Sequence, residues 1–336
     1  MKPRNLTIGK RRGLSSTSTE EGIFTVLAFD HRQSFVKMVN LDTKKPATYD
    51  QVVTAKLDVI EMLSPTASAV LLDPLYGASQ SIARDVLPAK TGLLIAVEKT
   101  GYSGKPTARI SSLLPDWGVS QIKKMGADAV KLLIYYHPDG GELTEKQDQL
   151  STMVAQQCQQ LDIAFFLEAV SYSIDPEHDK NSKEFADKRP ALITRLVKRL
   201  SALEPDVLKI EFPVDANHNQ DQKFWLEACQ SISEVSSCPW TVLSAGVDFL
   251  VFEQQVITAC QAGASGFIGG RAIWKEGIPM QPHDRKKWLE NVAQKRMNQL
   301  VRIAEEYASP WTDYYPPQEI GQFQEWYSNY KEQSHV

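Results

Sequence analysis

The stretch DVLKIEFP, residues 206–213, decides how the rest of the chain is interpreted. It is an apolar run typical of a buried β-strand, and Lys209 interrupts it. An ammonium group in a dry place is costly unless it is paired, and burial favours the neutral amine. A neutral lysine is a nucleophile suited to Schiff-base chemistry on a carbonyl. Lys209 is therefore either the reactive group of an enzyme or an ordinary strand residue that faces solvent or pairs with a carboxylate.

Two further runs carry charges in similar positions. The run DAVKLLIYY, residues 128–136, contains Lys131, and the run AFFLEA, residues 164–169, contains Glu168. A second positive charge near Lys209 would favour its neutral form, and a nearby glutamate would exchange protons with a substrate. Glu211 lies two residues after Lys209 and shares its face of the strand. Each charge alone is a weak signal, but together they indicate a catalytic site.

Eight short apolar runs alternate with longer amphipathic segments. The expected strands are Phe24–Asp30, Ser68–Asp73, Leu93–Glu98, Ala129–Tyr135, Ala164–Ala169, Asp206–Glu211, Trp240–Ala245 and Ser265–Gly269. The expected helices include Asp50–Leu63, Trp117–Met125, Lys146–Leu161 and Phe249–Ala262. Continuous apolar runs are typical of parallel strands covered on both faces, and eight β-then-α units predict an α/β fold, a TIM (β/α)8 barrel. A doubly wound open sheet is the alternative, because the number of strands does not prove closure.

Length and composition indicate a single globular domain. The chain has 336 residues, and no Gly/Ser linker divides it. We expect an N-terminal segment at residues 1–20, the barrel at 21–312 and a C-terminal extension at 313–336. The net charge of −4 argues against nucleic acid as a partner, and no apolar run reaches the ~18 residues of a membrane span. Four cysteines without a CxxC pair indicate reduced thiols in a cytoplasmic protein.

Charged residues gather where the expected strands end. Asp30, Asp73 and Glu98 close the first three strands. In a TIM barrel the catalytic residues lie at these carboxyl ends and on the loops that follow them. Segment 99–115 is expected to form a loop above the barrel, and the charged segment 175–190 is expected to be irregular. One carboxylate there is often only a helix cap, whereas the whole set indicates an active site.

The last two units are typical of a phosphate site. The seventh strand runs into Ser244–Val247 (SAGV) and the eighth into Gly269–Ala272 (GGRA). Glycines let backbone N–H groups approach an anion closely, and a helix N-terminus adds a favourable dipole. Arg271 can bind two phosphate oxygens at once. Ordinary turn chemistry would explain either loop alone, but two such loops on consecutive strands favour a phosphorylated small molecule as the ligand.

Nine short segments resemble the class I tagatose-1,6-bisphosphate aldolases and their close relatives. The resemblance extends over residues 20–312. The segments that carry it are Leu27–Asp30 (LAFD), Leu71–Pro74 (LLDP), Glu98–Tyr102 (EKTGY), Val130–Leu133 (VKLL), Phe166–Glu168 (FLE), Val207–Lys209 (VLK), Leu243–Val247 (LSAGV), Gly270–Trp274 (GRAIW) and Ser309–Thr312 (SPWT).

The resemblance implies roles for individual residues. Lys209 would form the Schiff base, Glu168 would be the acid/base, and Lys131 would be a second active-site lysine. Asp30 matches the family's aspartate after the first strand. The residues that match the family's anion-binding loops are Ser244, Gly246, Gly270 and Arg271. The implied reaction is reversible cleavage of a ketohexose 1,6-bisphosphate to dihydroxyacetone phosphate and glyceraldehyde 3-phosphate, with no metal or other cofactor, by a homo-oligomer.

One departure from the family follows the first expected strand, and another is a C-terminal tail after Thr312 that is longer than expected for the family. The family commonly has Asp-Gln-Arg after the first strand, and this chain has Asp30-His31-Arg32. We expect His31 at the rim near the distal end of the substrate, and expect it to bind substrate together with Arg32 and Glu98. Residues 263–274 also resemble sulfofructose-phosphate aldolases, so an aldolase acting on 6-deoxy-6-sulfofructose 1-phosphate is an alternative. Residues 98–102 favour the tagatose-bisphosphate branch.

Two other classes of function make different demands on the sequence. A non-catalytic phosphosugar sensor would be marked by loss of Lys209 or Glu168, and both are present. A metal-dependent aldolase would need a cluster of His, Asp and Glu at the strand ends. The six histidines are scattered, and only His31 directly follows a strand-closing acid. The sequence therefore favours Schiff-base chemistry.

Overall fold

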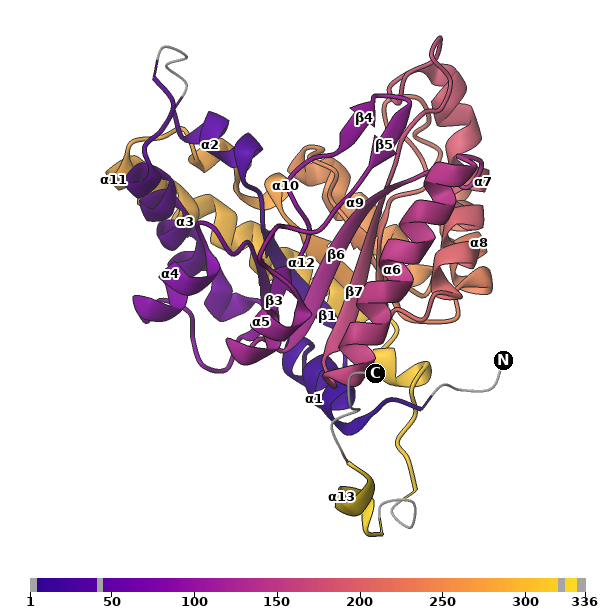
Figure 1. Cartoon of the computed structure of the whole chain (residues 1–336). Coiled ribbons are helices and arrows are strands. Elements are labelled where there is room, and N and C mark those ends of the chain that lie inside the picture. Colours follow the sequence, from indigo (N-terminus) through magenta and orange to yellow (C-terminus); the bar gives the residue numbers. More distant parts are fainter. Residues whose placement is uncertain (1–4, 41–44, 320–323, 331–336) are drawn as a thin grey trace.

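Eight parallel strands close into a barrel at the centre of the molecule (Figure 1). Their order is β1-β10-β9-β8-β7-β6-β3-β2, and β1 pairs with both β2 and β10. The strands are β1 (Phe24–Phe29), β2 (Ala69–Leu72), β3 (Gly92–Ala96), β6 (Ala129–Tyr136), β7 (Ala164–Ser171), β8 (Val207–Glu211), β9 (Trp240–Leu243) and β10 (Gly266–Gly269). The predicted TIM barrel is confirmed, because the two ends of the strand order pair with each other. The computed structural model describes residues 5–40, 45–319 and 324–330.

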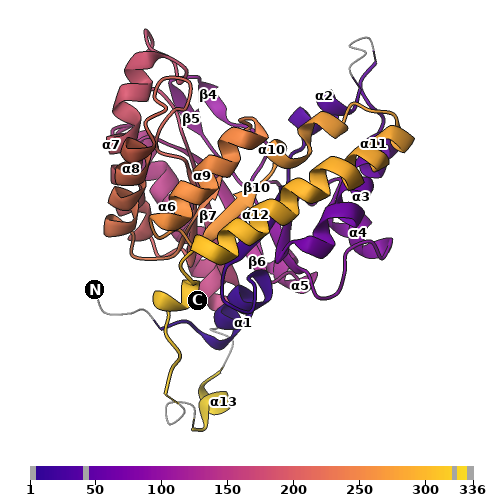
Figure 2. The same ribbon diagram turned by 180° about the vertical axis from the view of Figure 1, so that it is seen from behind.

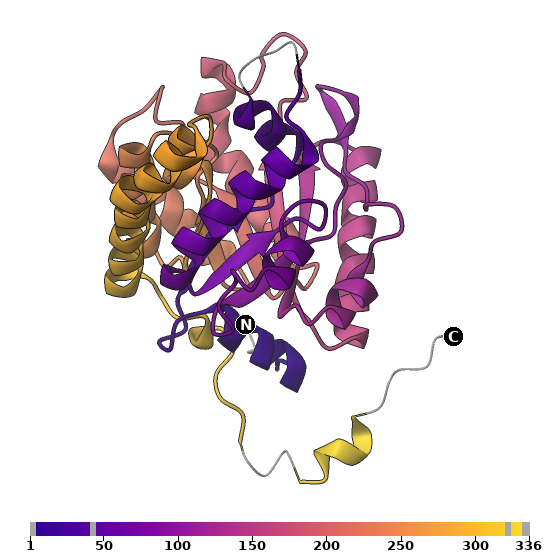
Figure 3. The same cartoon turned by 90° about the vertical axis from the view of Figure 1, so that its left-hand side faces the viewer.

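The helices surround the barrel, except α13, which the views show apart from it (Figures 2 and 3). They are α1 (Ile8–Thr17), α2 (Gln33–Val39), α3 (Tyr49–Leu63), α4 (Ala78–Ala83), α5 (Val119–Lys124), α6 (Glu142–Gln160), α7 (Lys183–Ser201), α8 (Gln222–Val235), α9 (Phe249–Gln261), α10 (Arg271–Trp274), α11 (Pro282–Trp288), α12 (Gln294–Tyr307) and α13 (Trp326–Asn329). Shorter turns are η1 (Ser64–Thr66), η2 (Lys275–Gly277), η3 (Leu289–Ala293) and η4 (Trp311–Asp313). Capping fixes some helix starts: Thr48 and Gln51 form a capping box at α3.

Two segments expected to be irregular contain regular structure. Segment 99–115 carries a hairpin of β4 (Ser103–Lys105) and β5 (Ala108–Ile110), above the mouth of the barrel (Figure 1). The prediction for segment 175–190 is wrong in its second half, because α7 begins at Lys183 and continues through Pro190. The Ser182 side chain caps this helix by accepting from the Phe185 N–H at 3.2 Å. Packing of the buried apolar face of α7 outweighs the cost of the internal proline.

Helix α1 closes the bottom of the barrel, at the amino ends of the strands (Figure 1). A Cβ at Gly13 would lie only 2.4 Å from the Asp128 carbonyl oxygen, so the helix approaches the start of β6 closely. Lys10 forms a buried ion pair with Asp206 at 3.0 Å. The Tyr315 hydroxyl, close to the end of the chain, donates to the Asp206 carbonyl at 3.0 Å. Helix α1 and the segment around Tyr315 thus cover one end of the barrel and leave the other open for a site.

The cysteines and the helices can be compared with two predictions from the sequence, reduced thiols and the lack of a membrane span. All four cysteine side chains are buried thiols, and none forms a disulfide. Over the described ranges, we find no helix with the length and apolar character that crossing a membrane requires.

Lys56 and Asp73 form a fully buried ion pair between α3 and the end of β2. Lys56 Nζ lies 2.6 Å from Asp73 Oδ2 and donates to the Phe29 carbonyl oxygen at 2.8 Å. Asp73 Oδ1 accepts from the backbone N–H groups of Leu75 and Tyr76 at 2.9 and 2.8 Å. The prediction that Asp73 belongs to the charged mouth of the barrel is therefore wrong, because its carboxylate points toward α3.

Replacing Lys56 by methionine is expected to lower the free energy of unfolding by about 3–5 kcal/mol, because the Asp73 charge would stay buried without a counter-ion. Adding Asp73→Asn should recover most of the loss, since the amide oxygen can still accept from Leu75 and Tyr76. Urea unfolding at pH 7 measures both changes. A loss below about 1 kcal/mol in the single variant, the range of exposed ion pairs, would contradict this account.

Candidate active site

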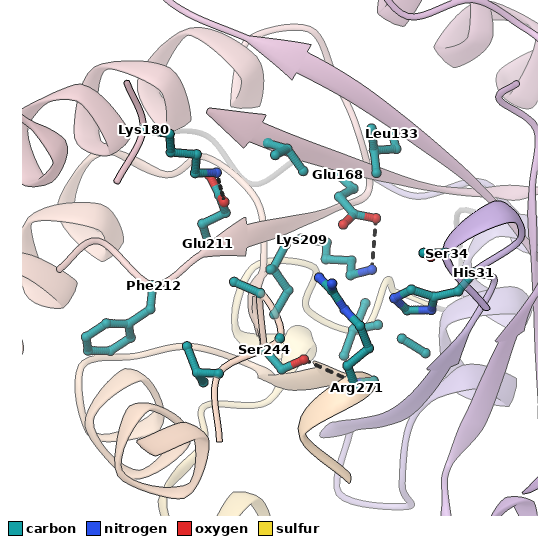
Figure 4. A pocket seen from close by; sticks show the side chains of 18 of the residues that line it. His31, Ser34, Leu133, Glu168, Lys180, Lys209, Glu211, Phe212, Ser244 and Arg271 are labelled. Carbon is teal, nitrogen blue, oxygen red and sulfur yellow. Dashed lines mark hydrogen bonds and ion pairs between the residues drawn. The ribbon is translucent and has the colours of Figure 1, made fainter. Parts of the chain in front are cut away.

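A cavity of about 700 Å³ opens at the carboxyl ends of the strands (Figure 4). Its lining includes ten of the eleven predicted site residues: Asp30, His31, Arg32, Glu98, Glu168, Lys209, Ser244, Gly246, Gly270 and Arg271. The eleventh, Lys131, is fully buried and contacts three of them. Residues separated by up to 241 positions along the chain therefore meet at one end of the barrel, because each follows or ends a strand.

Lys209 and Glu168 face each other from adjacent strands. They are direct partners in the register of β8 and β7, so both side chains point to the same side of the sheet. Lys209 Nζ lies 2.8 Å from Glu168 Oε2, and the two side chains are only 5% and 7% exposed. Figure 4 shows this contact in the middle of the cavity. At this distance a proton can pass directly between the amine and the carboxylate.

Lys131 is held by three carboxylates. Its Nζ lies 2.7 Å from Asp30 Oδ2, 2.7 Å from Glu98 Oε1 and 2.9 Å from Glu168 Oε2. Burial alone lowers the pKa of the Lys131 ammonium, but the charges of Asp30, Glu168 and Glu98 outweigh it and raise that pKa well above its usual value. Lys131 was expected to act on Lys209 as a nearby positive charge. In the structure that charge is compensated, and Lys131 instead fixes the carboxylates around Lys209.

Asp30 and Glu168 are charged despite their burial. Burial by itself raises the pKa of Asp30, but Lys131, Lys209 and His31 together hold it well below its ordinary value. Burial likewise raises the pKa of Glu168, and the charges of Lys131 and Lys209 more than offset this, so its pKa is lowered. Glu168 is therefore a carboxylate that can accept a proton from Lys209 or from a bound substrate.

His31 packs against the loop that follows β10. Its ring packs edge-on against Trp274, with centroids 5.1 Å apart, and a Cβ on Gly270 would lie 3.2 Å from its Cε1 atom. The reason is that β1 pairs with β10, so the loops that follow these two strands are neighbours. Burial lowers the pKa of His31 to about 3, and the charge of Arg271 adds to this while Asp30 opposes it. The imidazole is therefore neutral at pH 7.

Replacing His31 by glutamine is expected to remove a pH-dependent loss of stability. The folded-state pKa of about 3 lies below the unfolded value of 6.5, so below pH 6.5 only the unfolded chain gains this proton. The wild-type protein should therefore lose on the order of 2 kcal/mol relative to His31→Gln between pH 7 and pH 5. Urea unfolding of both proteins at the two pH values measures this difference. Equal pH slopes for the two proteins would contradict a neutral His31.

The loops after β9 and β10 lie against each other. The Gly270 N–H points toward Ser244 Oγ at 3.4 Å. Gly246 has φ 86°, and a Cβ there would lie 2.9 Å from Arg271 Cζ, so only glycine lets the loop approach the guanidinium. Within the described ranges no carboxylate pairs with Arg271, or with the buried Arg32. These two guanidinium groups are therefore available for an anion.

The sequence prediction missed the cations that surround Glu211 in the same cavity. Glu211 accepts from the Ser171 N–H and hydroxyl at 2.7 and 2.6 Å and forms an ion pair with Lys180. Burial raises the pKa of Glu211, but Lys180 and Arg189 outweigh it and hold the pKa at about 2. Arg189, on α7, also lines the cavity. The charges of segment 175–190 were the available signal, but they indicate exposure as readily as a site.

Carboxylate and imidazole side chains such as these are also common metal ligands. In the part of the chain that the structure describes, no three or more His, Cys, Asp or Glu side chains are arranged to hold a metal ion. The carboxylates of Asp30, Glu98 and Glu168 converge on the Lys131 ammonium. The site thus presents amines paired with carboxylates beside two anion-binding loops.

The sequence model of the DeoC/LacD family aldolases matches residues 24–276, which include every strand of the barrel. The chain belongs to the DeoC/LacD family of aldolases. The match extends from β1 to the turn that follows Arg271, so it contains all the residues that line the cavity.

Curated relatives of this DeoC/LacD aldolase match it almost end to end. The protein named tagatose 1,6-diphosphate aldolase 1 of Streptococcus pyogenes serotype M1 is 36% identical over 326 residues, covering 92% of this chain and 99% of that protein. Tagatose 1,6-diphosphate aldolase 2 of Enterococcus faecalis is 34% identical over 328 residues, covering 91% of this chain and 96% of that protein.

Solved structures share the fold of this DeoC/LacD aldolase. An archaeal fructose 1,6-bisphosphate aldolase aligns with a TM-score of 0.57 at 18% identity, over 88% of this chain and 98% of that one. A fructose-bisphosphate aldolase from Slackia heliotrinireducens aligns with a TM-score of 0.60 at 13% identity, over 90% and 93% of the two chains. At such low identity the likeness supports the TIM barrel alone.

Proposed function

We propose that Lys209 forms a Schiff base with a ketohexose 1,6-bisphosphate, which the enzyme cleaves to dihydroxyacetone phosphate and glyceraldehyde 3-phosphate. The observation that carries the proposal is the 2.8 Å contact of Lys209 Nζ with Glu168 Oε2, in a cavity that also contains the two anion-binding loops. Tagatose 1,6-bisphosphate is the favoured substrate, because the curated relatives carry its name. Its C4 epimer, which differs in the orientation of one hydroxyl, is a further candidate.

The first stage is formation of the iminium. Glu168 takes a proton from the Lys209 ammonium across the 2.8 Å contact, and the neutral amine attacks the C2 carbonyl of the substrate. The carbinolamine then loses its hydroxyl, which leaves as water with the proton that Glu168 holds. The iminium at C2 is the electron sink for the next step.

The second stage is cleavage of the C3–C4 bond. The electron pair of this bond moves into the iminium and forms an enamine, the C4 hydroxyl proton passes to Glu168, and the aldehyde product leaves. The enamine takes a proton at C3, and water hydrolyses the resulting iminium to free dihydroxyacetone phosphate and Lys209. Lys131 holds Glu168 and Asp30 in place throughout by its contacts at 2.9 and 2.7 Å. Asp30, which faces the cavity, is proposed to bind substrate hydroxyls.

The phosphate next to the reacting carbonyl is assigned to the loops after β9 and β10. The residues proposed to bind it are Ser244, Gly246, Gly270 and Arg271. His31 and Arg32 lie on the same side of the cavity and complete this part of the site as neutral and charged donors. Glu98 accepts from the Leu133 N–H at 3.0 Å and from Lys131, and its remaining cavity-facing surface contacts substrate hydroxyls.

The experiment that tests the proposal measures both products. Purified protein is incubated with tagatose 1,6-bisphosphate, and dihydroxyacetone phosphate and glyceraldehyde 3-phosphate are assayed in parallel, with and without a metal chelator. Equal amounts of the two products and a rate that the chelator leaves unchanged are expected. No cleavage, or cleavage that the chelator abolishes, would overturn the proposal.

A second candidate is an aldolase for a sulfosugar phosphate such as 6-deoxy-6-sulfofructose 1-phosphate. The observation that favours it is the resemblance of residues 263–274 to sulfofructose-phosphate aldolases. Comparing kcat/KM for the two substrates decides between them.

We also propose that the protein is a cytoplasmic homo-oligomer. The buried thiols fit a reducing compartment. The oligomeric state rests on the family resemblance and is measured by sedimentation.

A further inference from the structure

The cavity contains a second cluster of cations, separate from the anion-binding loops. Lys180, just before α7, and Arg189, on α7, both line the cavity. Lys180 pairs with Glu211, and Arg189 Nη1 lies 3.9 Å from Asp215 Oδ2. Figure 4 shows Lys180 and Glu211 on one side of Lys209, with Arg271 on the other.

Both cations keep donors that no protein group uses. The Arg189 side chain is 9% exposed, and its Nε atom is buried without a hydrogen-bond partner among the residues that the structure describes. The Nε edge of a guanidinium can donate side-on to two oxygens of one anion. The Lys180 ammonium has three N–H donors, and Glu211 accounts for one of them. Glu211 is itself fixed by the Ser171 N–H and hydroxyl, so it orients Lys180.

A third cation, Arg109, lies close enough to act on Lys180. The Arg109 guanidinium stands over the rings of Tyr102, Tyr135 and Tyr172 at 4.6, 5.4 and 5.5 Å, and no carboxylate pairs with it over the described part of the chain. Burial lowers the pKa of Lys180, Glu211 opposes this, and the charges of Arg189 and Arg109 lower it further. Three cations therefore share a region with two carboxylates, Glu211 and Asp215, and the excess positive charge favours an anion.

The distance along β8 from Lys209 to this cluster suits the length of a hexose bound at Lys209. Glu211 follows Lys209 by two residues on β8, which raises it by about 6.6 Å toward the mouth of the barrel. In a ketohexose bound at C2, four carbon–carbon bonds of about 1.5 Å each separate C2 from C6. The group on C6 can thus reach Lys180 while the group on C1 lies at Arg271.

We propose that Lys180 and Arg189 form a subsite for the anionic group on C6 of the substrate, with Arg109 contributing charge. This assignment rests on the proposed aldolase function and deepens it. His31 is then left on the C1 side, because it approaches Gly270 in the loop that follows β10. Arg32, its neighbour in sequence and a lining residue of the same cavity, is assigned to this side as well. The same two cations would bind a phosphate or a sulfonate, because both present three oxygens to the donors.

The test compares substrates with and without the distal group. kcat/KM is measured for a ketohexose 1,6-bisphosphate and for the matching 1-phosphate, in the wild type and in Lys180→Gln, Arg189→Gln and Arg32→Gln. The ratio is kcat/KM for the bisphosphate divided by kcat/KM for the 1-phosphate. It should fall about 10- to 100-fold in Lys180→Gln and in Arg189→Gln, because each variant loses charged hydrogen bonds to the distal group alone. Arg32→Gln should lower both values together and leave the ratio within a factor of two or so.

Controls separate this result from misfolding and from failure of the proposed function. Lys188→Gln, an exposed neighbour of Arg189 on α7, should leave the ratio at the wild-type value. Trapping of dihydroxyacetone phosphate by borohydride, which needs no distal group, reports whether each variant keeps its Schiff-base site. An unchanged ratio in both Lys180→Gln and Arg189→Gln, or a ratio that falls only in Arg32→Gln, would overturn the subsite. A 6-sulfonate substrate in the same series identifies which anion the wild type prefers.

Discussion

Replacing Lys209 by methionine is expected to reduce kcat by a factor on the order of 10⁴ to 10⁶, the range seen when a covalent nucleophile is removed. Methionine has a similar length and can occupy the same buried position, but it cannot form an iminium. Glu168 keeps its contact with Lys131 at 2.9 Å, so its charge stays paired in the variant. Steady-state assay of bisphosphate cleavage gives the change in kcat directly.

The control for this variant is Lys223→Met. Lys223 lies on α8, its side chain is 84% exposed, and its contact with Glu227 is a loose 3.9 Å. The Lys223→Met variant should cleave the substrate at the wild-type rate. If Lys209→Met retained more than about a tenth of the wild-type kcat, a change worth only about 1.4 kcal/mol in the barrier, Lys209 would not be the nucleophile.

Replacing Lys131 by methionine is expected to cost about 3–5 kcal/mol of stability at pH 7, because three buried carboxylates lose their shared counter-ion. Asp30, Glu98 and Glu168 would then face one another, with only Lys209 to offset their charge. The variant should also lose activity, since Glu168 would retain a proton or move from its present position. Urea unfolding at pH 7 measures the loss of stability.

The pH dependence of this variant distinguishes its mechanism. In the wild type the folded-state pKa values of Asp30 and Glu168 are lowered, so their contribution to stability is present above the unfolded values and is lost as the pH falls through the folded ones. In Lys131→Met the mutual repulsion raises the pKa of at least one carboxylate above its unfolded value. Relative to the wild type, the variant should therefore gain stability from pH 7 to pH 5. A variant that loses as much stability as the wild type, or more, over this range would contradict the account.

The fold could be predicted from the sequence because each barrel strand is a continuous apolar run. β8, for example, carries Val207, Leu208 and Ile210 in five residues, and all five are buried. Closure of the barrel could not be predicted, because it depends on pairing between β1 and β10, which lie more than 230 residues apart. The charges of segment 175–190 suggested irregular structure, and only the buried apolar face of α7 shows why its second half is helical in spite of Pro190.

The site could be predicted only as far as charges stand out within apolar strands. Lys209, Lys131 and Glu168 have this signal. Asp73 has a similar one, but its partner Lys56 lies on α3, and no local pattern shows that the two are paired. Lys180 and Arg189 lack the signal, because they lie in a charged segment that is typical of an exposed surface. Their place in the cavity depends on how the segment after β7 folds toward Glu211.

The central claim is that Lys209 is the residue that forms the covalent intermediate. The protein is incubated with dihydroxyacetone phosphate, reduced with borohydride and digested, and the modified peptide is identified by mass spectrometry. We predict a single stable adduct on Lys209, which is absent after Lys209→Met and present after Lys223→Met. An adduct on Lys131, Lys180 or any other lysine in place of Lys209, or no adduct at all, would contradict the account.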